Sequence, residues 1–202
     1  MNPSIRIICP VAILMTSVSL SAQESGDRFT KIGEFQILKV TLHQVKMKLG
    51  PSRFTASGQA GDYQASIQYQ ADGVYVNFFS GEMGGPQLDL LGFSISRSRR
   101  GNAKVKISTS RLPLQTNIAG IHLGMSRNEF TNLLGVKVDW LGDKASSVFK
   151  WQQPYTPVEQ KRLDPSNSAP DRHFFYMEVW VEGTFSQDNL VAFSVWKSEE
   201  PA

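Results

Sequence analysis

Three histidines and a glycine-rich segment are the residues whose types could support catalysis or ligand binding. His43, His122 and His173 lie far apart in the sequence, and none has a second ligand at the spacing typical of a metal site. Gly81–Gly85 lacks the lysine and hydroxyl residue that follow the glycines of a phosphate-binding loop. We therefore expect no catalytic residue, no metal and no cofactor. A small hydrolase stays open as an alternative, because scattered acidic residues could converge in the fold.

A set of aromatic residues favours binding over catalysis. Apolar side chains alternate with other types along Phe174–Val181 and Leu190–Lys197, which is typical of strands that place one face on a core. The aromatic residues that the alternation turns away from the core, and that we predict to contact a partner, are Tyr75, Phe79, Phe174, Tyr176, Trp180 and Trp196. Aromatic rings among small polar groups are typical of a recognition surface. Alternatively, two sheets pack on each other, or on a second copy, and bury these rings.

A basic patch lies between Asp89 and Glu129, where the sequence has no acidic residue. The patch comprises Arg97, Arg99, Arg100, Lys104 and Lys106. Such a cluster attracts anionic partners, here an anionic component of the cell envelope. The alternative is a solvated hairpin whose charges protect a sheet edge. The net charge is only +3, and we expect no nucleic-acid partner.

The N-terminal residues 1–22 have the pattern of an export signal. Arg6 precedes the uncharged apolar segment Ile7–Leu20, and the small residues that end at Ala22 suit cleavage. This segment is shorter than the roughly 20 apolar residues that span a bilayer. Cys9 lies within it, so the mature chain has no cysteine and no lipidation site. We expect a periplasmic or secreted protein with no transmembrane segment after cleavage.

The elements that must position the aromatic residues occur twice. In each copy a hydroxyl residue that can cap a helix precedes a short amphipathic segment ending in Leu-Gly, in Thr41–Gly50 and in Ser126–Gly135. Two similar strand segments, Leu91–Arg97 and Val191–Lys197, follow in the same order. The repeat predicts an α+β fold of two tandem modules, each a short helix followed by an antiparallel β-meander.

The expected organisation has four parts. A signal peptide covers residues 1–22, an N-terminal lead covers 23–36, and the two modules cover 37–110 and 111–202. The lead is polar over its first residues, and we expect it to be loose. The second module carries a proline-rich insertion over residues 152–172. A segment of this length is expected to be either functional or disordered.

The segment Gly120–Phe130, with Leu134 and Gly135 after it, resembles the opening signature of the SmpA/OmlA family of small outer-membrane assembly lipoproteins. The tandem arrangement resembles that of the secreted β-lactamase inhibitor protein. The resemblance implies a bacterial periplasmic or secreted module that works by protein contact. The family's lipid anchor does not transfer to this chain, and Lys39 stands where the second copy has Gly124.

The function that these observations favour is an exported, non-catalytic protein-binding module of the bacterial cell envelope. It would contact a protein partner, of unknown identity, through its aromatic sheet face. The first alternative is a structural or assembly accessory of envelope complexes, and the second is the small hydrolase.

Overall fold

The computed structural model describes residues 25–59, 63–71, 73–98, 108–110, 113–169 and 172–202. The expected signal peptide and Cys9 lie outside the described residues. So do four of the five residues of the basic patch, namely Arg99, Arg100, Lys104 and Lys106.

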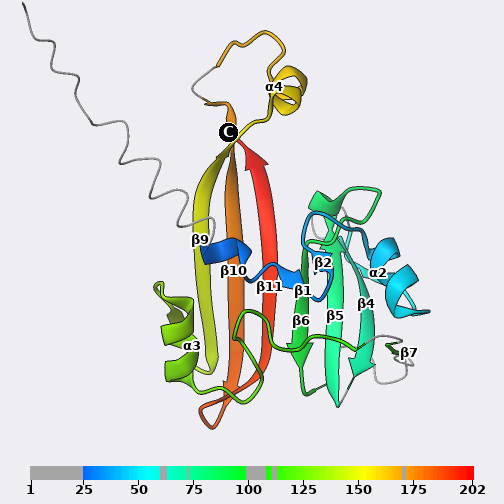
Figure 1. The fold of residues 1–202 in the computed structure, drawn as a ribbon, viewed down its shortest axis with the longest axis vertical. Helices are drawn as coiled ribbons and strands as arrows, with labels where there is room; N and C mark the ends of the chain where they lie inside the picture. Colours follow the sequence, from blue (N-terminus) through cyan, green and yellow to red (C-terminus); the bar gives the residue numbers. More distant parts are fainter. Residues whose placement is uncertain (1–24, 60–62, 72, 99–107, 111–112, 170–171) are drawn as a thin grey trace, which may run out of the picture.

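The described chain is an α+β protein with a mainly antiparallel sheet and few helices (Figure 1). Eight strands lie in the order β3-β4-β5-β6-β11-β10-β9-β8, and β7 pairs with β4. In the half nearer the N-terminus the strands are β3 (Thr55–Ser57), β4 (Gln64–Ala71), β5 (Val74–Gly81), β6 (Gly92–Ser96) and β7 (Ser108–Thr109). In the other half they are β8 (Asp139–Leu141), β9 (Lys144–Pro154), β10 (Phe174–Ser186) and β11 (Asn189–Pro201).

Two helices pack on one face of this sheet. Helix α2 (Leu42–Leu49) and helix α3 (Arg127–Leu134) each begin with a capping box, at Thr41 and Ser126. Their apolar residues are buried in the same core as the apolar residues of the strands. For example, the ring of Phe130 lies 5.5 Å from that of Phe185 in β10. Helices this short are stable only when they pack on a larger element, and here the sheet is that element.

The two halves of the sheet meet where β6 pairs with β11, and this pairing is symmetric. Ser94 lies opposite Ser194, and the register on either side follows a two-fold pattern, with Gly92 opposite Trp196 and Ser96 opposite Ala192. The next hydrogen bonds obey the same pattern. The amide of Arg97 donates to the carbonyl of Val191, and that of Lys197 donates to the carbonyl of Leu91.

Each helix is also joined by equivalent backbone bonds to one segment of its half, the residues just before β6 in one half and the start of β11 in the other. The amide of Leu90 donates to the carbonyl of Val40, just before the cap Thr41, and the amide of Leu190 donates to the carbonyl of Met125, just before the cap Ser126. The caps themselves form isolated bridges, Thr41 with Asp89 and Ser126 with Asn189. The residues before β6 and the first residues of β11 therefore fix where each helix begins.

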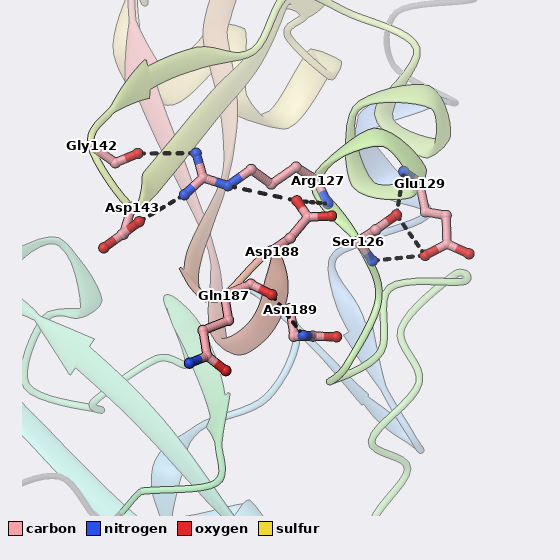
Figure 2. Close-up of polar contacts among 8 residues, drawn as sticks. All are labelled: Ser126, Arg127, Glu129, Gly142, Asp143, Gln187, Asp188 and Asn189. Atoms are coloured by element: carbon pink, nitrogen blue, oxygen red, sulfur yellow. Dashed lines mark hydrogen bonds and ion pairs between the residues drawn. The ribbon is translucent and has the colours of Figure 1, made fainter.

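Arg127 adds side-chain contacts at the start of α3 (Figure 2). Its guanidinium lies 2.7 Å from the carboxylate of Asp143, donates to the carbonyl of Gly142, and lies 3.8 Å from the carboxylate of Asp188. These residues belong to the turns between β8 and β9 and between β10 and β11. The segment Gly120–Phe130 thus has a structural role, since its residue Arg127 connects helix α3 to two turns of the sheet.

The expectation of a loose N-terminal lead is wrong for the described residues 25–36. A small hairpin, β1 (Lys31–Ile32) and β2 (Phe35–Gln36), crosses the helix-covered side of the sheet (Figure 1). Phe29 is fully buried against Phe149 of β9, and Phe35 packs edge-on against Phe78 of β5. These few apolar residues contact both halves of the sheet. The mostly polar composition of the segment gave no indication of these contacts.

Two further segments differ from expectation. Strand β7 pairs in parallel with β4, Tyr69 opposite Ser108, so it does not form an antiparallel hairpin after β6. The proline-rich insertion contains a short helix, α4 (Pro157–Leu163), that begins at the capping box of Thr156 and projects beyond the sheet (Figure 1). Its described residues are thus ordered, and the disordered alternative does not apply to them.

Candidate functional site: one face of the sheet

The face of the sheet opposite α2 and α3, called here the open face, carries the predicted contact residues. Burial alternates along β10, where Phe175 and Val179 are buried while Tyr176 and Trp180 are not. The same alternation runs along β5 and β9. The halves lie side by side in one sheet, so they do not pack face to face over the aromatic residues. The alternative in which two sheets of the chain pack on each other is therefore wrong, while packing on a second copy stays an alternative.

Three of the predicted aromatic residues lie in one row that crosses the sheet. Phe79 pairs with Gly92, Gly92 with Trp196, and Trp196 with Trp180. A Cβ atom at Gly92 would lie 2.4 Å from Cζ of Phe79 and 2.5 Å from the carbonyl oxygen of Val195. The ring of Phe79 therefore leans over Gly92, and only glycine leaves room for it.

The two tryptophans of this row stack on each other. Their ring centroids are 5.1 Å apart and their planes differ by 2°. The Nζ atom of Lys150 lies 5.9 Å from the ring centroid of Trp180, and the indole of Trp180 donates to Glu178. Hydrogen bonds from Lys150 and Trp180 hold the pKa of Glu178 below its ordinary value. Trp180 is thus fixed on several sides by neighbours.

A pocket of about 390 Å³ lies beside Trp196. Trp196 and Phe79 line the pocket, and polar groups from Asn77, Glu182 and Ser194 line it as well. Leu91 and Met83 add apolar surface. A concave site with aromatic walls and a few polar groups is the usual form of a binding pocket.

A polar row lies next to the aromatic row. Asn77 pairs with Ser94, Ser94 with Ser194, and Ser194 with Glu182. Ser94 is only 2% exposed although it lies on the open face, because its small side chain sits below larger neighbours. The hydroxyl of Ser194 donates to Oε2 of Glu182 at 3.1 Å. Among the described residues no basic side chain lies within ion-pair distance of Glu182.

The other predicted aromatic residues lie apart from this row. Tyr75 pairs with Ser96, two residues along the strands from the polar row. Phe174 and Tyr176 form a separate edge-on pair at the start of β10, with ring centroids 5.0 Å apart. Tyr176 is 49% exposed, and the other five predicted rings are half-buried. The six residues therefore share one face but form more than one cluster.

The remaining candidates from the sequence do not join this site. Arg97, the one described residue of the basic patch, is exposed after the end of β6. The ring of His43 packs against Phe54 beside α2, while His173 lies 2.9 Å from the carboxylate of Asp164 in the insertion. Within the described ranges no group of three metal-ligating side chains comes together. No helix in the same ranges is long and apolar enough to cross a membrane.

Sequence reasoning missed Glu182 as a member of the site. The alternation predicted a strand that ends at Val181, whereas β10 continues to Ser186. Glu182 continues the open-face series two residues after Trp180, so a longer reading of the same alternation would have found it. Met83 was not detectable in this way, since it lies in a 3₁₀ turn (Glu82–Gly84) after β5.

The chain was also compared with known proteins. No protein-family model matches it, and no curated protein or solved structure is significantly similar to it.

Proposed function

We propose that this chain is an exported, non-catalytic protein-binding module of the bacterial cell envelope, and that the open face contacts the partner. The observation that carries the proposal is the row of Phe79, Trp196 and Trp180 beside a pocket with a polar row. Tryptophan and tyrosine most often dominate the binding energy of protein interfaces. The fixed positions of the stacked tryptophans lower the entropy that binding would otherwise cost.

The proposal includes an architecture of two tandem modules, resembling the SmpA/OmlA family. Its support is the symmetric register about Ser94 and Ser194, together with the matching bonds that join the start of each helix to the residues before β6 and at the start of β11. A duplicated module that pairs through its last strand would produce both. The two halves would then act as one scaffold for a single continuous face.

Export is the second part of the proposal, and it rests on the sequence of residues 1–22. We expect cleavage after Ala22, so that the mature protein begins at Gln23. N-terminal sequencing of protein recovered from the periplasm or the medium measures this directly. An intact Met1 on chains found only in the cytoplasm would contradict it.

The binding role is tested by capture of a partner from a bacterial envelope extract, with the mature chain as bait. Trp180→Ala and Trp196→Ala should each abolish capture, because truncating a hot-spot tryptophan typically costs about 2 kcal/mol or more. Circular dichroism and the melting temperature should change little, since both rings are only half-buried.

A matched control is Met47→Ala, which removes a side chain that is 74% exposed on α2, away from the open face. This variant should capture the partner as well as the unaltered chain does. If the two tryptophan variants are stable and still capture the partner, the open face is not the contact surface.

A further inference from the structure

The pocket beside Trp196 has the chemistry of a site for a flat cation. We infer that it receives an arginine side chain of the partner protein, whose guanidinium stacks on the free ring face of Trp196 and donates to the carboxylate of Glu182. The inference rests on the proposed function and names the partner group that this part of the face recognises.

Trp196 forms an aromatic wall of the pocket. One ring face of Trp196 is covered by Trp180, and the other is directed along the row toward Gly92 and Phe79. Because Gly92 has no side chain, the ring of Phe79 leans over it from the neighbouring strand. Trp196 and Phe79 both line the pocket, which therefore has aromatic walls. Guanidinium groups stack well on tryptophan.

The pocket also carries a negative charge on Glu182. Of the residues that line the pocket, only Glu182 and Lys197 carry a charge. The ammonium of Lys197 is already engaged, since it lies 2.7 Å from Asp27 and 5.0 Å from the ring centroid of Trp151, a buried core residue. Within the described part of the chain, Glu182 has no such cation, and the one hydrogen bond to its carboxylate comes from Ser194. The pocket therefore presents an uncompensated carboxylate.

The carboxylate of Glu182 lies on the same face of the sheet as the ring of Trp196. Glu182 pairs with Ser194, which precedes Trp196 by two residues on the same strand and the same face. Diagonal neighbours of this kind lie about 7–8 Å apart, within reach of long side chains. The fork of an arginine can stack on a ring and donate hydrogen bonds to a carboxylate beside it at the same time. Asn77, at the far end of the polar row, also lines the pocket.

The test uses two capped peptides, acetyl-Gly-Ser-Arg-Ser-Gly-amide and the same peptide with citrulline, which keeps the shape and removes the charge. Binding to the full mature chain is followed by NMR, through the indole Nε1–H of Trp196 and the amide of Glu182. We expect saturable shifts at both signals with the arginine peptide, and about tenfold weaker binding of the citrulline peptide. A tenfold change corresponds to about 1.4 kcal/mol.

Glu182→Gln should weaken the arginine peptide by about the same factor while leaving the citrulline peptide unchanged. Glu200→Gln is the matched control, since it removes an exposed carboxylate from the neighbouring strand β11, on the same face but outside the pocket. Equal binding of the two peptides, insensitivity to Glu182→Gln, or the lack of any shift at millimolar peptide would each overturn the inference.

Its failure is distinguishable from failure of the proposed function. If Trp196→Ala abolishes partner capture and Glu182→Gln does not weaken it, the open face is the contact surface but the arginine pocket is wrong. If neither Trp180→Ala nor Trp196→Ala affects capture, the proposed function itself is wrong.

Discussion

Among single side chains, Asp164 organises more of its surroundings than any residue singled out in the sequence. Its carboxylate accepts hydrogen bonds from the amides of Ser168 and Ala169 at 3.0 Å, and the ring of His173 lies 2.9 Å from Oδ2. The ring of Tyr155 stacks on His173. One carboxylate therefore holds the loop after α4 to the start of β10. The proline-rich composition of the insertion gave no indication of this arrangement.

These contacts predict that the insertion depends on pH. The hydrogen bond with His173, and then those from the backbone, hold the pKa of Asp164 well below its ordinary value of about 3.9. Because the pKa is lower in the folded loop than in the unfolded one, the stabilisation is present above about pH 4 and is lost as the pH falls toward the folded value. The NMR amide shifts of Ser168 and Ala169 should move toward random-coil values as the solution is acidified.

Asp164→Asn should displace the same two amide signals already at pH 6, because an amide side chain offers one acceptor oxygen where the carboxylate offers two. Asp139→Asn alters an exposed carboxylate of β8 and is the control. Loop signals that stay in place in the Asp164→Asn variant would show that the carboxylate does not hold this loop.

Among the secondary-structure elements, the helices and their caps could be predicted from the sequence, and the sheet order could not. Thr41 and Ser126 cap α2 and α3, and Leu49 and Leu134 are buried near the helix ends as the apolar spacing indicates. Alternation likewise predicted which residues of β5, β10 and β11 face the core. It contains no information on which strand lies beside which, since pairing is set by contacts between residues far apart in sequence.

The same limit explains what was missed at the site. The row of Phe79, Trp196 and Trp180 comes from three strands, so its members are neighbours only once β6 pairs with β11. The ring of Phe79 can lean over β6 only because Gly92 pairs with it. Sequence patterns thus predicted the face on which the aromatic residues lie, but not which of them form one cluster.

Burial of the two helix ends predicts comparable losses of stability. Leu49→Ala and Leu134→Ala should each lower the free energy of unfolding by about 2–5 kcal/mol, because each removes a buried side chain and leaves a cavity. Chemical denaturation followed by circular dichroism measures both. Met47→Ala, which truncates an exposed side chain of α2, should change the value by less than about 0.5 kcal/mol. An unchanged midpoint in either leucine variant would contradict the packing of that helix.

On the scale of the whole molecule, the described residues have one buried apolar cluster that runs through both halves. The segment before β1 and the β1–β2 hairpin contribute to it at both ends, through Phe29 on β9 and Phe35 on β5. Lys197 reinforces the connection by its ion pair with Asp27. The two halves are therefore joined by the shared sheet on one side and by this segment on the other.

Unfolding should consequently be a single cooperative transition. Phe29→Ala and Phe35→Ala should each shift that transition as a whole, lowering stability by about 3–5 kcal/mol, although the two rings contact different halves. Calorimetry and near-ultraviolet circular dichroism should give the same midpoint. Lys31→Ala, at an exposed position of β1, is the control. Two separate transitions, with each phenylalanine affecting only one, would show that the halves unfold independently.

The symmetric register of β6 and β11 has a consequence for the orientation in which a partner could bind. The two-fold pattern relates Trp196 to Ser96 and Trp180 to Tyr75, so the backbone repeats while the side chains do not. A partner turned by half a rotation over the open face would meet the same strands but different chemistry. The backbone is thus nearly the same in both orientations. The aromatic residues on one side of the two-fold axis distinguish one orientation from the other.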